Sequence, residues 1–480
     1  MLSGAKRSRS ISIPANDSTR AGRCVTSVDS PARPAMKTLD ADIHILGGGP
    51  AGLAAGYYAK KRGLDFVLFE AGDQPGGNCR TLRLGEFLFD TGAHRLHDKD
   101  PEVTCEIKEL LGDELSDVAA PSEIFFQDEF FSFPLQMGNL VKRLDRKILL
   151  QIAAENLRVK RRKPAASFGE FALNQYGQTL ANLFLLNYSR KLWGADPHQL
   201  STDVSGGRMK GLNLASFVRE VLLGKVSRPG HLDGSFLYPK YGFGMIVDKM
   251  SEFIGSKRIH VNSRVSRLVH SRGRLDRVVL NDNSEVEVST VVNTLPLTLS
   301  AKMLDPPPPP ELLAAANAVK YRNLILCVFG LDRPCFSPNA SLYFPGAEFP
   351  FTRLYEPKNR SRHMAPEGQT AIVLELPCFR EDAVWNMSAE ALRRSVWEAL
   401  QRVKPIAEGE VVCFATYKLP FAYPVLEVGL AEHVERLVAY FQTFENLYLT
   451  GRSSLFRYVH LHDLFKAGKE LVFDLPHAED

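Results

Sequence analysis

The sequence contains few cysteines and arranges them in no recognisable pattern. Only 7 of the 480 residues are cysteine, and they form neither a C-x-x-C pair nor a His/Cys cluster at zinc spacing. We therefore expect a reducing compartment and no structural metal. Long apolar runs are also missing, since stretches such as 324–331 (LILCVFGL) fall far short of the ~20 residues that a membrane-spanning helix requires. No helix that crosses a bilayer is predicted.

Excess charge is small and is confined to one end of the chain. The formal net charge is +4, but residues 1–39 contain seven Lys or Arg and two Asp, so this segment carries +5 and the remainder carries −1. A nearly neutral body gives no reason to expect a nucleic-acid partner. Apolar residues make up 45% and charged residues 24%, as in globular proteins, and the length implies two lobes or one large interleaved domain.

The first 39 residues are rich in Ser, Arg and Pro and lack the apolar core of a signal peptide. We expect a disordered basic extension. Two interpretations remain open: a peptide resembling an organelle-targeting sequence, or an extension upstream of an internal start at Met36. We favour the internal start because the first strand begins a few residues later, and we expect a cytoplasmic protein.

Residues 42–70 have the pattern strand, glycine-rich turn, helix, strand. Residues 42–46 (DIHIL) predict a buried strand, and G-G-G-P-A-G follows at 47–52. An Ala-rich helical run then ends near Gly63, before a second predicted strand at 66–69 (FVLF). This order is typical of a βαβ nucleotide-binding unit.

Three glycines and one acid in this unit have separate physical tasks. Gly47 permits the tight turn, Gly49 lets a pyrophosphate approach the backbone, and Gly52 lets the helix pack closely on the strand, with the helix N-terminus facing the phosphates. Glu70 ends the second strand, 18 residues beyond Gly52, where its carboxylate is placed to accept hydrogen bonds from ribose hydroxyls. The combination predicts a dinucleotide site.

The continuation of the chain carries a family resemblance. After Glu70 it reads A-G-D-Q-P-G-G-N-C-R-T and then G-E-F-L-F-D-T-G-A-H-R-L-H, with a doublet at Gly76-Gly77 and a further close approach at Asp90-x-Gly92. Two distant segments match the same pattern: the alternating strands of 260–296, and N-L-Y-L-T-G-R-S-S-L-F-R-Y-V-H-L-H near the C-terminus. This combination resembles the amine-oxidase-like flavoprotein superfamily, which includes protoporphyrinogen oxidases and UDP-galactopyranose mutases.

The resemblance spans about residues 40–472 and implies an α/β fold with non-covalent FAD. A Rossmann-like FAD-binding domain (glutathione-reductase-2 type) would be interleaved with a mixed helical and antiparallel-sheet substrate domain. The FAD-binding domain is expected from residues 40–100, 230–300 and 420–475. The substrate domain is expected from residues 101–229 and 301–419.

The resemblance also implies particular cofactor contacts. It places a backbone contact to adenine at Val265, Arg452 near the pyrophosphate, and the start of the last helix, around Leu461, under the flavin ring. The cofactor residues implied are Gly47, Gly49, Pro50, Ala51, Gly52, Glu70, Ala71, Gly77, Asn78, Gly92, Ala93, His94, Val265, Gly451, Arg452 and Leu461.

Two further absences bear on the cofactor. No cysteine lies in 451–462 or beside His94, so the covalent thioether flavin of some relatives is not expected. No second G-x-G-x-x-G follows downstream, so a dedicated NAD(P)H domain is not expected and any reductant or oxidant must reach the flavin directly.

Several segments resemble the mutase branch of the superfamily. G-G-N at 76–78 and G-A-H-R-L-H at 92–97 match a pattern whose first histidine, here His94, sits against the flavin; the alternative is a buried histidine satisfied by the backbone. Residues 188–200 (YSRKLWGADPHQL) match a segment whose tryptophan, here Trp193, lines the sugar-nucleotide pocket; the alternative is a core aromatic.

Arg208 and Arg322 stand where that branch places substrate arginines, and guanidinium groups bind diphosphate oxygens in a bidentate fork.

Other positions depart from the mutase pattern. Mutases carry two tyrosines in the C-terminal motif, where this chain has Phe456 and then Tyr458, and they carry an acid where His460 stands. Residues 238–247, 306–310 and 341–356 are more similar to bacterial chains grouped with protoporphyrinogen oxidases. The branch is therefore left open by the sequence.

Three functions follow as hypotheses. The first is hydride transfer to flavin from an unidentified substrate, phosphorylated or sugar-linked, with His94, Tyr458 and His460 near the ring as general base or positioning groups. The second is a redox-neutral nucleotide-sugar mutase, in which Arg208, Arg322 and Tyr458 hold the diphosphate and Trp193 lies on the nucleotide side. The third, a flavin-binding protein without turnover, is disfavoured because the insertion at 100–255 has the size of a substrate lobe.

A basic stretch lies inside that insertion. Between residues 142 and 163 an apolar sequence (ILLQIAA) is interleaved with cations. They are Lys142, Arg143, Arg146, Lys147, Arg158, Lys160, Arg161, Arg162 and Lys163. On a helix they predict either peripheral contact with anionic headgroups at the inner face of a membrane or steering of a phosphorylated substrate. A solvated helical insertion is the alternative.

Overall fold

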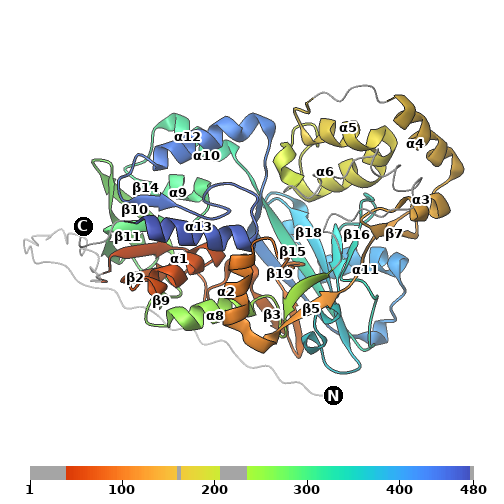
Figure 1. Cartoon of the computed structure of the whole chain (residues 1–480), viewed down its shortest axis with the longest axis horizontal. Coiled ribbons are helices and arrows are strands. Elements are labelled where there is room, and N and C mark those ends of the chain that lie inside the picture. The colour runs from red at the N-terminus through yellow and green to blue at the C-terminus, as the bar shows by residue number, and fades with distance from the viewer. Residues whose placement is uncertain (1–38, 40, 159–163, 206–234, 476–480) are drawn as a thin grey trace, which may run out of the picture.

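A computed structural model describes residue 39 and residues 41–158, 164–205 and 235–475. The chain forms two lobes that lie side by side (Figure 1). The predicted N-terminal extension, except for residue 39, and the predicted substrate residue Arg208 lie outside the described residues.

A parallel sheet of five strands forms the centre of the first lobe, in the order β20-β13-β1-β2-β9. Its strands are β1 (Ile43–Leu46), β2 (Phe66–Phe69), β9 (Ile259–His260), β13 (Thr290–Asn293) and β20 (Leu447–Leu449). All residues of β1 and β2 are buried, as is usual for parallel strands covered on both faces. Each strand comes from one of the three segments predicted for the FAD-binding domain.

Two layers cover this sheet. One face packs against α1 (Pro50–Lys61), α2 (Pro101–Leu111), α8 (Met245–Ile254) and α13 (Leu461–Asp474). The other face meets a second sheet, of order β12-β11-β10-β14, together with three helices. The elements of this second layer are β10 (Val265–Ser271), β11 (Arg274–Leu280), β12 (Glu285–Glu287), β14 (Leu304–Asp305), α9 (Leu297–Met303), α10 (Pro310–Ala318) and α12 (Ala431–Phe441).

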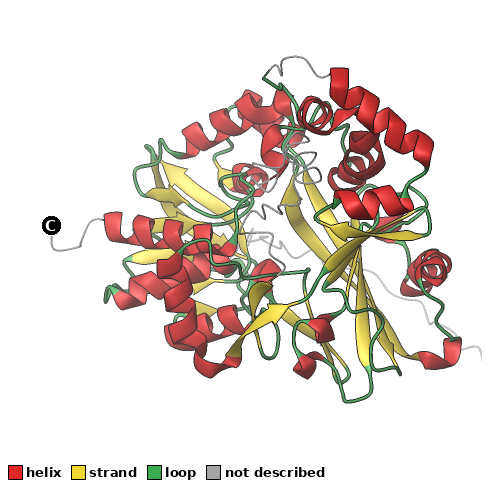
Figure 2. Cartoon of the chain, turned by 45° about the vertical axis from the view of Figure 1, so that its right-hand side comes forward, coloured by secondary structure: helices red, strands yellow, loops and turns green. Residues whose placement is uncertain are grey.

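A larger sheet of order β19-β15-β18-β17-β16-β6-β7 forms the second lobe, and its strands lie right of centre in Figure 2. All its neighbouring strands are antiparallel except β16 and β6. The strands are β6 (Ser122–Phe126), β7 (Glu129–Phe133), β15 (Tyr321–Leu331), β16 (Ser341–Tyr343), β17 (Arg353–Tyr355), β18 (Thr370–Cys378) and β19 (Val411–Pro424).

The two faces of this large sheet have different neighbours. Alternate residues of β15, such as Ile325 and Cys327, belong to the core that includes α11 (Ala389–Val403). The residues between them, such as Leu324 and Leu326, pack with Phe89 of the hairpin formed by β3 (Thr81–Leu84) and β4 (Phe87–Asp90). The hairpin belongs to the predicted FAD-binding segment 40–100, so this face of the sheet is directed toward the first lobe.

Helices at the far end of the second lobe complete the insertion. They are α3 (Met137–Arg143), α4 (Arg146–Arg158), α5 (Phe168–Leu180), a π-helical turn (Ala181–Leu186) and α6 (Asn187–Trp193). A short pair, β5 (Leu115–Ala119) and β8 (Ser235–Pro239), connects the insertion to the rest. None of the helices in the described part of the chain combines the length and the apolar character needed to cross a membrane.

The predicted fold class is confirmed, whereas the predicted domain boundaries do not follow the packing at every point. Helix α2 was expected in the substrate domain, but its buried residues Val103, Ile107 and Leu111 lie in the core with α1 and α13. Helix α10 was also expected there, yet it packs against α12 in the first lobe. Both helices bury their apolar faces in the two cores of the first lobe, so they belong to that lobe.

Candidate functional site

The turn after β1 is built around two close backbone approaches. Gly47 has φ of +99°, a left-handed conformation that favours glycine, and its N–H donates to Phe69 O at 2.9 Å. A Cβ on Gly52 would lie 1.9 Å from the carbonyl oxygen of Gly47, so a glycine is required where α1 meets the turn. A Cβ on Gly49 would have no described atom within 4 Å. The N-terminus of α1, at Pro50, is therefore approachable through Gly49.

The acid predicted to bind ribose and the segment predicted to contact adenine lie beside each other, near the β9 side of the parallel sheet. The Glu70 carboxylate accepts the N–H groups of Gly48 at 2.8 Å and Gly72 at 2.7 Å. Its main-chain carbonyl accepts the N–H of Ser263 at 2.8 Å, which brings the start of β10, with Val265, beside it. Ala71, next in the chain, is exposed. The predicted contacts of Glu70, Ala71 and Val265 with ribose and adenine stay predictions.

Two distant glycine segments meet the N-terminal turn of α1. The N–H of Gly76 donates to Gly48 O at 2.7 Å, and a Cβ on Gly77 would lie 3.0 Å from Gly49 Cα. Gly451 has φ of +101°, and its Cβ would lie 2.8 Å from the Cβ of Ala51. The predicted phosphate-contacting segments are therefore brought together in space.

Arg452, which follows Gly451, provides a test of whether an anionic cofactor fits. Its guanidinium carbon lies 4.5 Å from the ring centre of Tyr458 and 5.0 Å from that of Tyr423. Its buried Nε and Nη2 atoms have no hydrogen-bond acceptor among the described residues. Buried donors without acceptors are costly, and a guanidinium prefers phosphate oxygens. The arrangement fits a pyrophosphate beside the N-terminus of α1.

His94 follows Gly92 and Ala93 and is enclosed between the lobes. Its ring stacks on Phe243 with centres 4.9 Å apart. One ring nitrogen is hydrogen-bonded to the backbone of Asn78, while Nε2 is buried and has no partner among the described residues. Burial lowers the pKa of His94 to about 3, and the charges of Arg353 and Arg360 act in the same direction. His94 is therefore neutral near pH 7, and only one of its nitrogens is satisfied by the backbone.

Aromatic residues predicted for the substrate pocket and for the surroundings of the flavin ring form one group. Trp193 is buried at the end of α6, with its ring 5.7 Å from Tyr458 and 5.9 Å from Tyr423. The ring of His460 lies 5.8 Å from Tyr458, and the His460 N–H donates to Asp463 Oδ2 at 2.7 Å, capping α13. Leu461 is the first residue of that helix. Trp193 and His460 thus both adjoin Tyr458, whose ring lies against Arg452.

Arg322 does not have the environment expected of a phosphate ligand. Its guanidinium donates to the carbonyl oxygens of Lys191 and Leu192, both at 3.1 Å, and of Pro377 at 2.8 Å. It also lies 3.5 Å from Asp382. These contacts bind the C-terminal end of α6 to the large sheet, because a cation stabilises the unpaired carbonyls at a helix C-terminus. We therefore replace the predicted substrate role of Arg322 with this structural one.

The structure adds an ion pair that the sequence analysis missed. Arg353 on β17 binds Glu375 on β18 in a bidentate geometry, with N–O distances of 2.8 and 2.7 Å, and Glu375 Oε1 also accepts the N–H of Ala93 at 3.1 Å. Tyr188 and Tyr423 are close enough to affect this pair electrostatically. The sequence could have indicated this pair, because Glu375 is the lone carboxylate in an apolar run, AIVLELP at 371–377, and a buried carboxylate is almost always paired.

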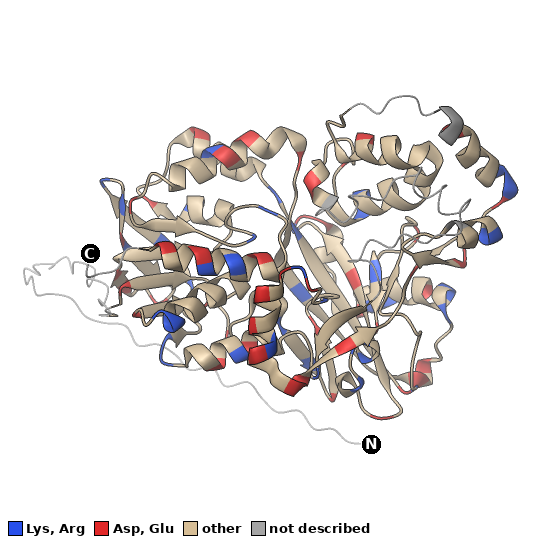
Figure 3. Cartoon of the chain, in the orientation of Figure 1, with Lys and Arg blue, Asp and Glu red and all other residues tan. Residues whose placement is uncertain are grey.

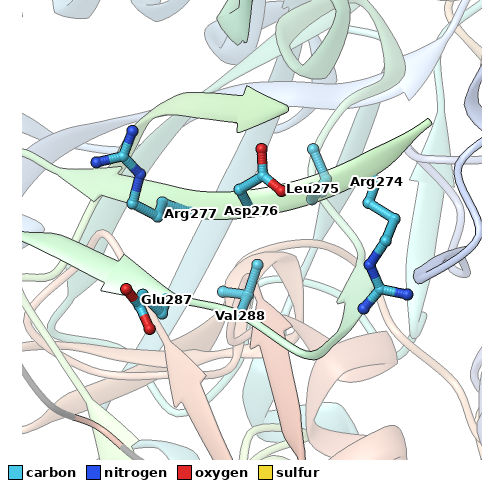
Figure 4. A pocket seen from close by; sticks show the side chains of 6 residues that line it. All are labelled: Arg274, Leu275, Asp276, Arg277, Glu287 and Val288. Atoms are coloured by element: carbon cyan, nitrogen blue, oxygen red, sulfur yellow. The ribbon is translucent and has the colours of Figure 1, made fainter. Parts of the chain in front are cut away.

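A surface recess of about 320 Å³ lies away from these residues, on β11 and β12 (Figure 4). Its lining residues are Arg274, Leu275, Asp276, Arg277, Glu287 and Val288. Oppositely charged side chains alternate there, and Arg277 already pairs with Glu285 at 2.5 Å. None of the predicted site residues lines it. Among the described residues, no group of three or more His, Cys, Asp or Glu side chains has the arrangement of a metal site.

Several curated relatives of the chain are oxidases of porphyrinogens. The coproporphyrinogen III oxidase of Bacillus subtilis (strain 168) is 21% identical over 464 residues, which cover 90% of this chain and 97% of the relative. Protoporphyrinogen oxidase 1 of Spinacia oleracea chloroplasts is 23% identical over 295 residues, which cover 55% of this chain and 52% of the relative.

Solved structures share the fold over nearly the whole chain. A reduced UDP-galactopyranose mutase matches with a TM-score of 0.80 at 20% identity, covering 90% of this chain and 95% of that one. A putative protoporphyrinogen oxidase from Exiguobacterium sp. 255-15 matches with a TM-score of 0.71 at 19% identity, covering 91% and 99%. The model of the family "Flavin containing amine oxidoreductase" matches residues 50–470. The chain therefore belongs to the flavin-containing amine oxidoreductase family and is a flavin-dependent enzyme.

Proposed function

We propose that the chain binds FAD without a covalent bond and oxidises a small-molecule substrate in the space between its two lobes. The observation that carries this proposal is the Arg452 guanidinium, whose buried Nε and Nη2 atoms lack an acceptor among the described residues, beside the convergence of Gly49, Gly77 and Gly451 on α1. FAD is favoured over a nicotinamide dinucleotide because three separated segments line this position, as the family requires.

Bound FAD would supply the hydride acceptor. The chain contributes orientation and hydrogen bonding around it. Neutral His94 has a buried Nε2 without a partner among the described residues, which can accept a hydrogen bond from a substrate. The N-terminus of α13, where Asp463 accepts the His460 N–H, carries the positive end of the helix dipole and would face the flavin ring under this proposal. Trp193, Tyr423 and Tyr458 form an aromatic wall on the substrate side.

Two observations favour hydride removal from the substrate over the redox-neutral alternative. Arg322 uses its donors on backbone carbonyls, so it has little left for a diphosphate. Phe456 is buried and has no hydroxyl where the mutase pattern has a tyrosine. The similarity to a porphyrinogen oxidase over 90% of the chain agrees with oxidation. We therefore propose that the substrate is a reduced compound that donates a hydride.

A nucleotide-sugar mutase remains a second candidate. The observation that favours it is the contact of Trp193 with Tyr458 next to Arg452, because this would hold a nucleotide close to the flavin. Its phosphate-binding capacity would depend on Arg452 and on Arg208, which lies outside the described residues.

The FAD proposal is tested by titrating flavin-free protein with FAD for the natural chain, Arg452→Met and Arg457→Met. We expect Arg452→Met to raise the FAD dissociation constant at least about tenfold, because loss of a charge-assisted hydrogen bond costs about 1.5–3 kcal/mol. The exposed neighbour Arg457 is the control and should bind FAD normally. Equal affinity of all three proteins would contradict the proposal. Flavin that stays with the acid-denatured protein would contradict non-covalent binding.

The reaction class is decided with the FAD-loaded protein under anaerobic conditions. Coproporphyrinogen III and protoporphyrinogen are offered to the oxidised flavin, and UDP-galactopyranose is offered to the flavin reduced with dithionite. Bleaching of the flavin by a porphyrinogen supports the oxidase. Conversion of UDP-galactopyranose to its furanose form, without net flavin oxidation, supports the mutase and excludes the proposed hydride-transfer oxidation.

We further propose that the second lobe associates peripherally with anionic membranes through α3 and α4. Lys142, Arg146 and Lys147 are exposed there, and the side chains of Val141 and Leu150 are 54% and 71% exposed. Figure 3 shows cations along these helices at one end of the molecule. Exposed apolar residues beside cations suit a headgroup layer, where each cation contributes about 1 kcal/mol. Residues 159–163 of the predicted stretch lie outside the described residues.

Flotation with vesicles tests this association. We expect binding to vesicles that contain about one third phosphatidylglycerol, an anionic lipid, and weak binding to pure phosphatidylcholine. The triple change Lys142→Glu, Arg146→Glu and Lys147→Glu should abolish binding, and Leu150→Ser should weaken it. Lys257→Glu, Arg264→Glu and Lys302→Glu change the net charge equally in the other lobe and should leave binding intact. Equal binding by both triple variants would refute the assignment.

A further inference from the structure

Three side chains from the large-sheet lobe hold the backbone of the loop at residues 90–94. The Tyr355 hydroxyl donates to Asp90 O, Glu375 Oε1 accepts the N–H of Ala93 at 3.1 Å, and Arg360 Nη1 donates to His94 O at 3.2 Å. The loop belongs to the first lobe and carries Gly92 and His94. The lobe that would hold substrate therefore fixes the loop at three successive points.

All three side chains are buried, which makes these contacts costly to lose. Tyr355 is 0% exposed, Glu375 is 2% and Arg360 is 4%. In such surroundings a polar group left without its partner costs about 1–3 kcal/mol. Arg353 occupies the other side of Glu375 with two hydrogen bonds, at 2.8 and 2.7 Å, so the carboxylate cannot turn away from Ala93.

The loop is also fixed from within the first lobe. The Asp90 carboxylate accepts the N–H of Phe243 at 2.9 Å and the hydroxyl of Thr81 at 2.7 Å. Phe243 in turn stacks on the His94 ring. With its ring nitrogen bonded to the Asn78 backbone, His94 has an orientation set by backbone positions on both sides. A displacement of Ala93 would therefore be transmitted to the ring.

We propose that Glu375, assisted by Tyr355 and Arg360, is a positioning residue that holds His94 in register with the flavin and couples the large sheet to the cofactor site. The proposal rests on the proposed FAD binding and adds a role for residues that hold the 90–94 loop by its backbone. Glu375 acts on the loop through the Ala93 N–H, and Arg353 keeps the Glu375 carboxylate in place.

The test uses Glu375→Asp, which keeps the charge but shortens the side chain by one methylene. The matched control is Glu410→Asp, because Glu410 in the same lobe also pairs with an arginine, Arg333 at 2.6 Å, and accepts one backbone N–H, that of Ala407 at 2.8 Å. Among the described residues, the hydrogen bonds of the Glu410 carboxylate go to Arg333 and Ala407 and not to the 90–94 loop. Each change is made with His94 present and with His94→Ala.

Two measurements are made on each protein. The first is hydrogen exchange of the peptide containing residues 90–96, measured without FAD. The second is the midpoint potential and visible spectrum of bound flavin. We expect Glu375→Asp to speed exchange of this peptide about tenfold. It should also shift the flavin potential when His94 is present and much less when His94 is alanine. Glu410→Asp should change neither reading.

Two results overturn the proposal. Unchanged exchange in Glu375→Asp would mean that the carboxylate does not hold the loop. An equal shift of flavin potential with and without His94 would mean that Glu375 acts on the flavin field directly and not through His94. Failure of every variant, and of the natural chain, to bind FAD is a different outcome: it rejects the proposed function, while the exchange measurement still decides whether Glu375 holds the loop.

Discussion

Gly49 and Gly52 lie one helical turn apart in the same motif, yet they are required for different physical reasons. Gly52 is required by the protein itself, because a Cβ there would lie 1.9 Å from the carbonyl oxygen of Gly47. Gly49 has open surroundings among the described residues, so nothing in the fold demands a glycine. The remaining reason for Gly49 is the ligand, since a pyrophosphate at the N-terminus of α1 would occupy the position of a side chain.

This difference gives a prediction for two alanine variants. Gly52→Ala should destabilise the flavin-free protein by about 1–3 kcal/mol, the usual cost of overpacking, and should also impair FAD binding. Gly49→Ala should leave the unfolding of the flavin-free protein unchanged and weaken FAD binding alone. Urea unfolding and FAD titration measure the two effects. If Gly49→Ala binds FAD normally, the pyrophosphate does not lie where we place it.

At the scale of elements, α6 is attached to the large sheet by its own basic residue. Lys191 Nζ donates to the carbonyl oxygens of Gly346 at 2.8 Å and Phe349 at 2.9 Å, in the connection between β16 and β17. Burial lowers the pKa of Lys191 to about 7, only partly offset by the charge of Glu348. The helix that ends in Trp193 is therefore held by a lysine whose charge is costly to bury.

The lowered pKa predicts how stability depends on pH. Between about pH 7, the folded-state pKa, and 10.5, the ordinary value, the unfolded chain binds more protons at this site than the folded chain does. The contribution of Lys191 to the free energy of unfolding must therefore increase with pH across this window, by up to about 1.4 kcal/mol per unit. Lys191→Met should lose that slope in urea unfolding between pH 7 and pH 10. The exposed control Lys302→Met should keep it, and parallel curves for all three proteins would refute the assignment.

At the scale of the whole molecule, the chain passes repeatedly between the lobes, and the loop at residues 90–94 is held from both. The three tryptophans, Trp193, Trp385 and Trp397, all belong to the second lobe, whereas the cofactor motif belongs to the first. Fluorescence of tryptophan therefore reports on the lobe that does not carry the nucleotide-binding motif.

This arrangement predicts coupled unfolding. Saturating FAD should raise the midpoint of thermal unfolding observed by tryptophan fluorescence, because a ligand stabilises the entire cooperative unit that it binds. At a concentration of about 100 times the dissociation constant, the gain should be about 2.7 kcal/mol. A midpoint that stays constant while FAD binds would show that the lobes unfold independently.

Much of the cofactor half was predictable from local sequence. The turn at Gly47, the helix from Pro50 and the strand ending at Glu70 are contiguous, so period, glycine spacing and the terminal acid predict them together. The roles of Gly76, Gly77 and Gly451 came from a family resemblance, and the structure brings these segments to α1. The fold class is confirmed by the same topology.

Prediction was weaker wherever distant residues decide an environment. Arg322 has the residue type of a phosphate ligand, but the carbonyl groups that occupy it belong to α6 and β18. The amphipathic stretch after Lys142 was read as one unit, whereas the structure divides it between α3 and α4. A side chain's type gives its possible partners, and only the packing selects among them.

The sequence by itself determined the family, the dinucleotide motif and the fold class, because these depend on residues close together or on a pattern shared along the whole chain. Tertiary structure alone decided that His94 Nε2 is buried and the ring neutral, that Arg353 pairs with Glu375, and that Glu375 reaches Ala93. The physical reason is that burial, charge pairing and hydrogen bonding across two lobes depend on which distant side chains become neighbours. These neighbours are set only when the chain has folded.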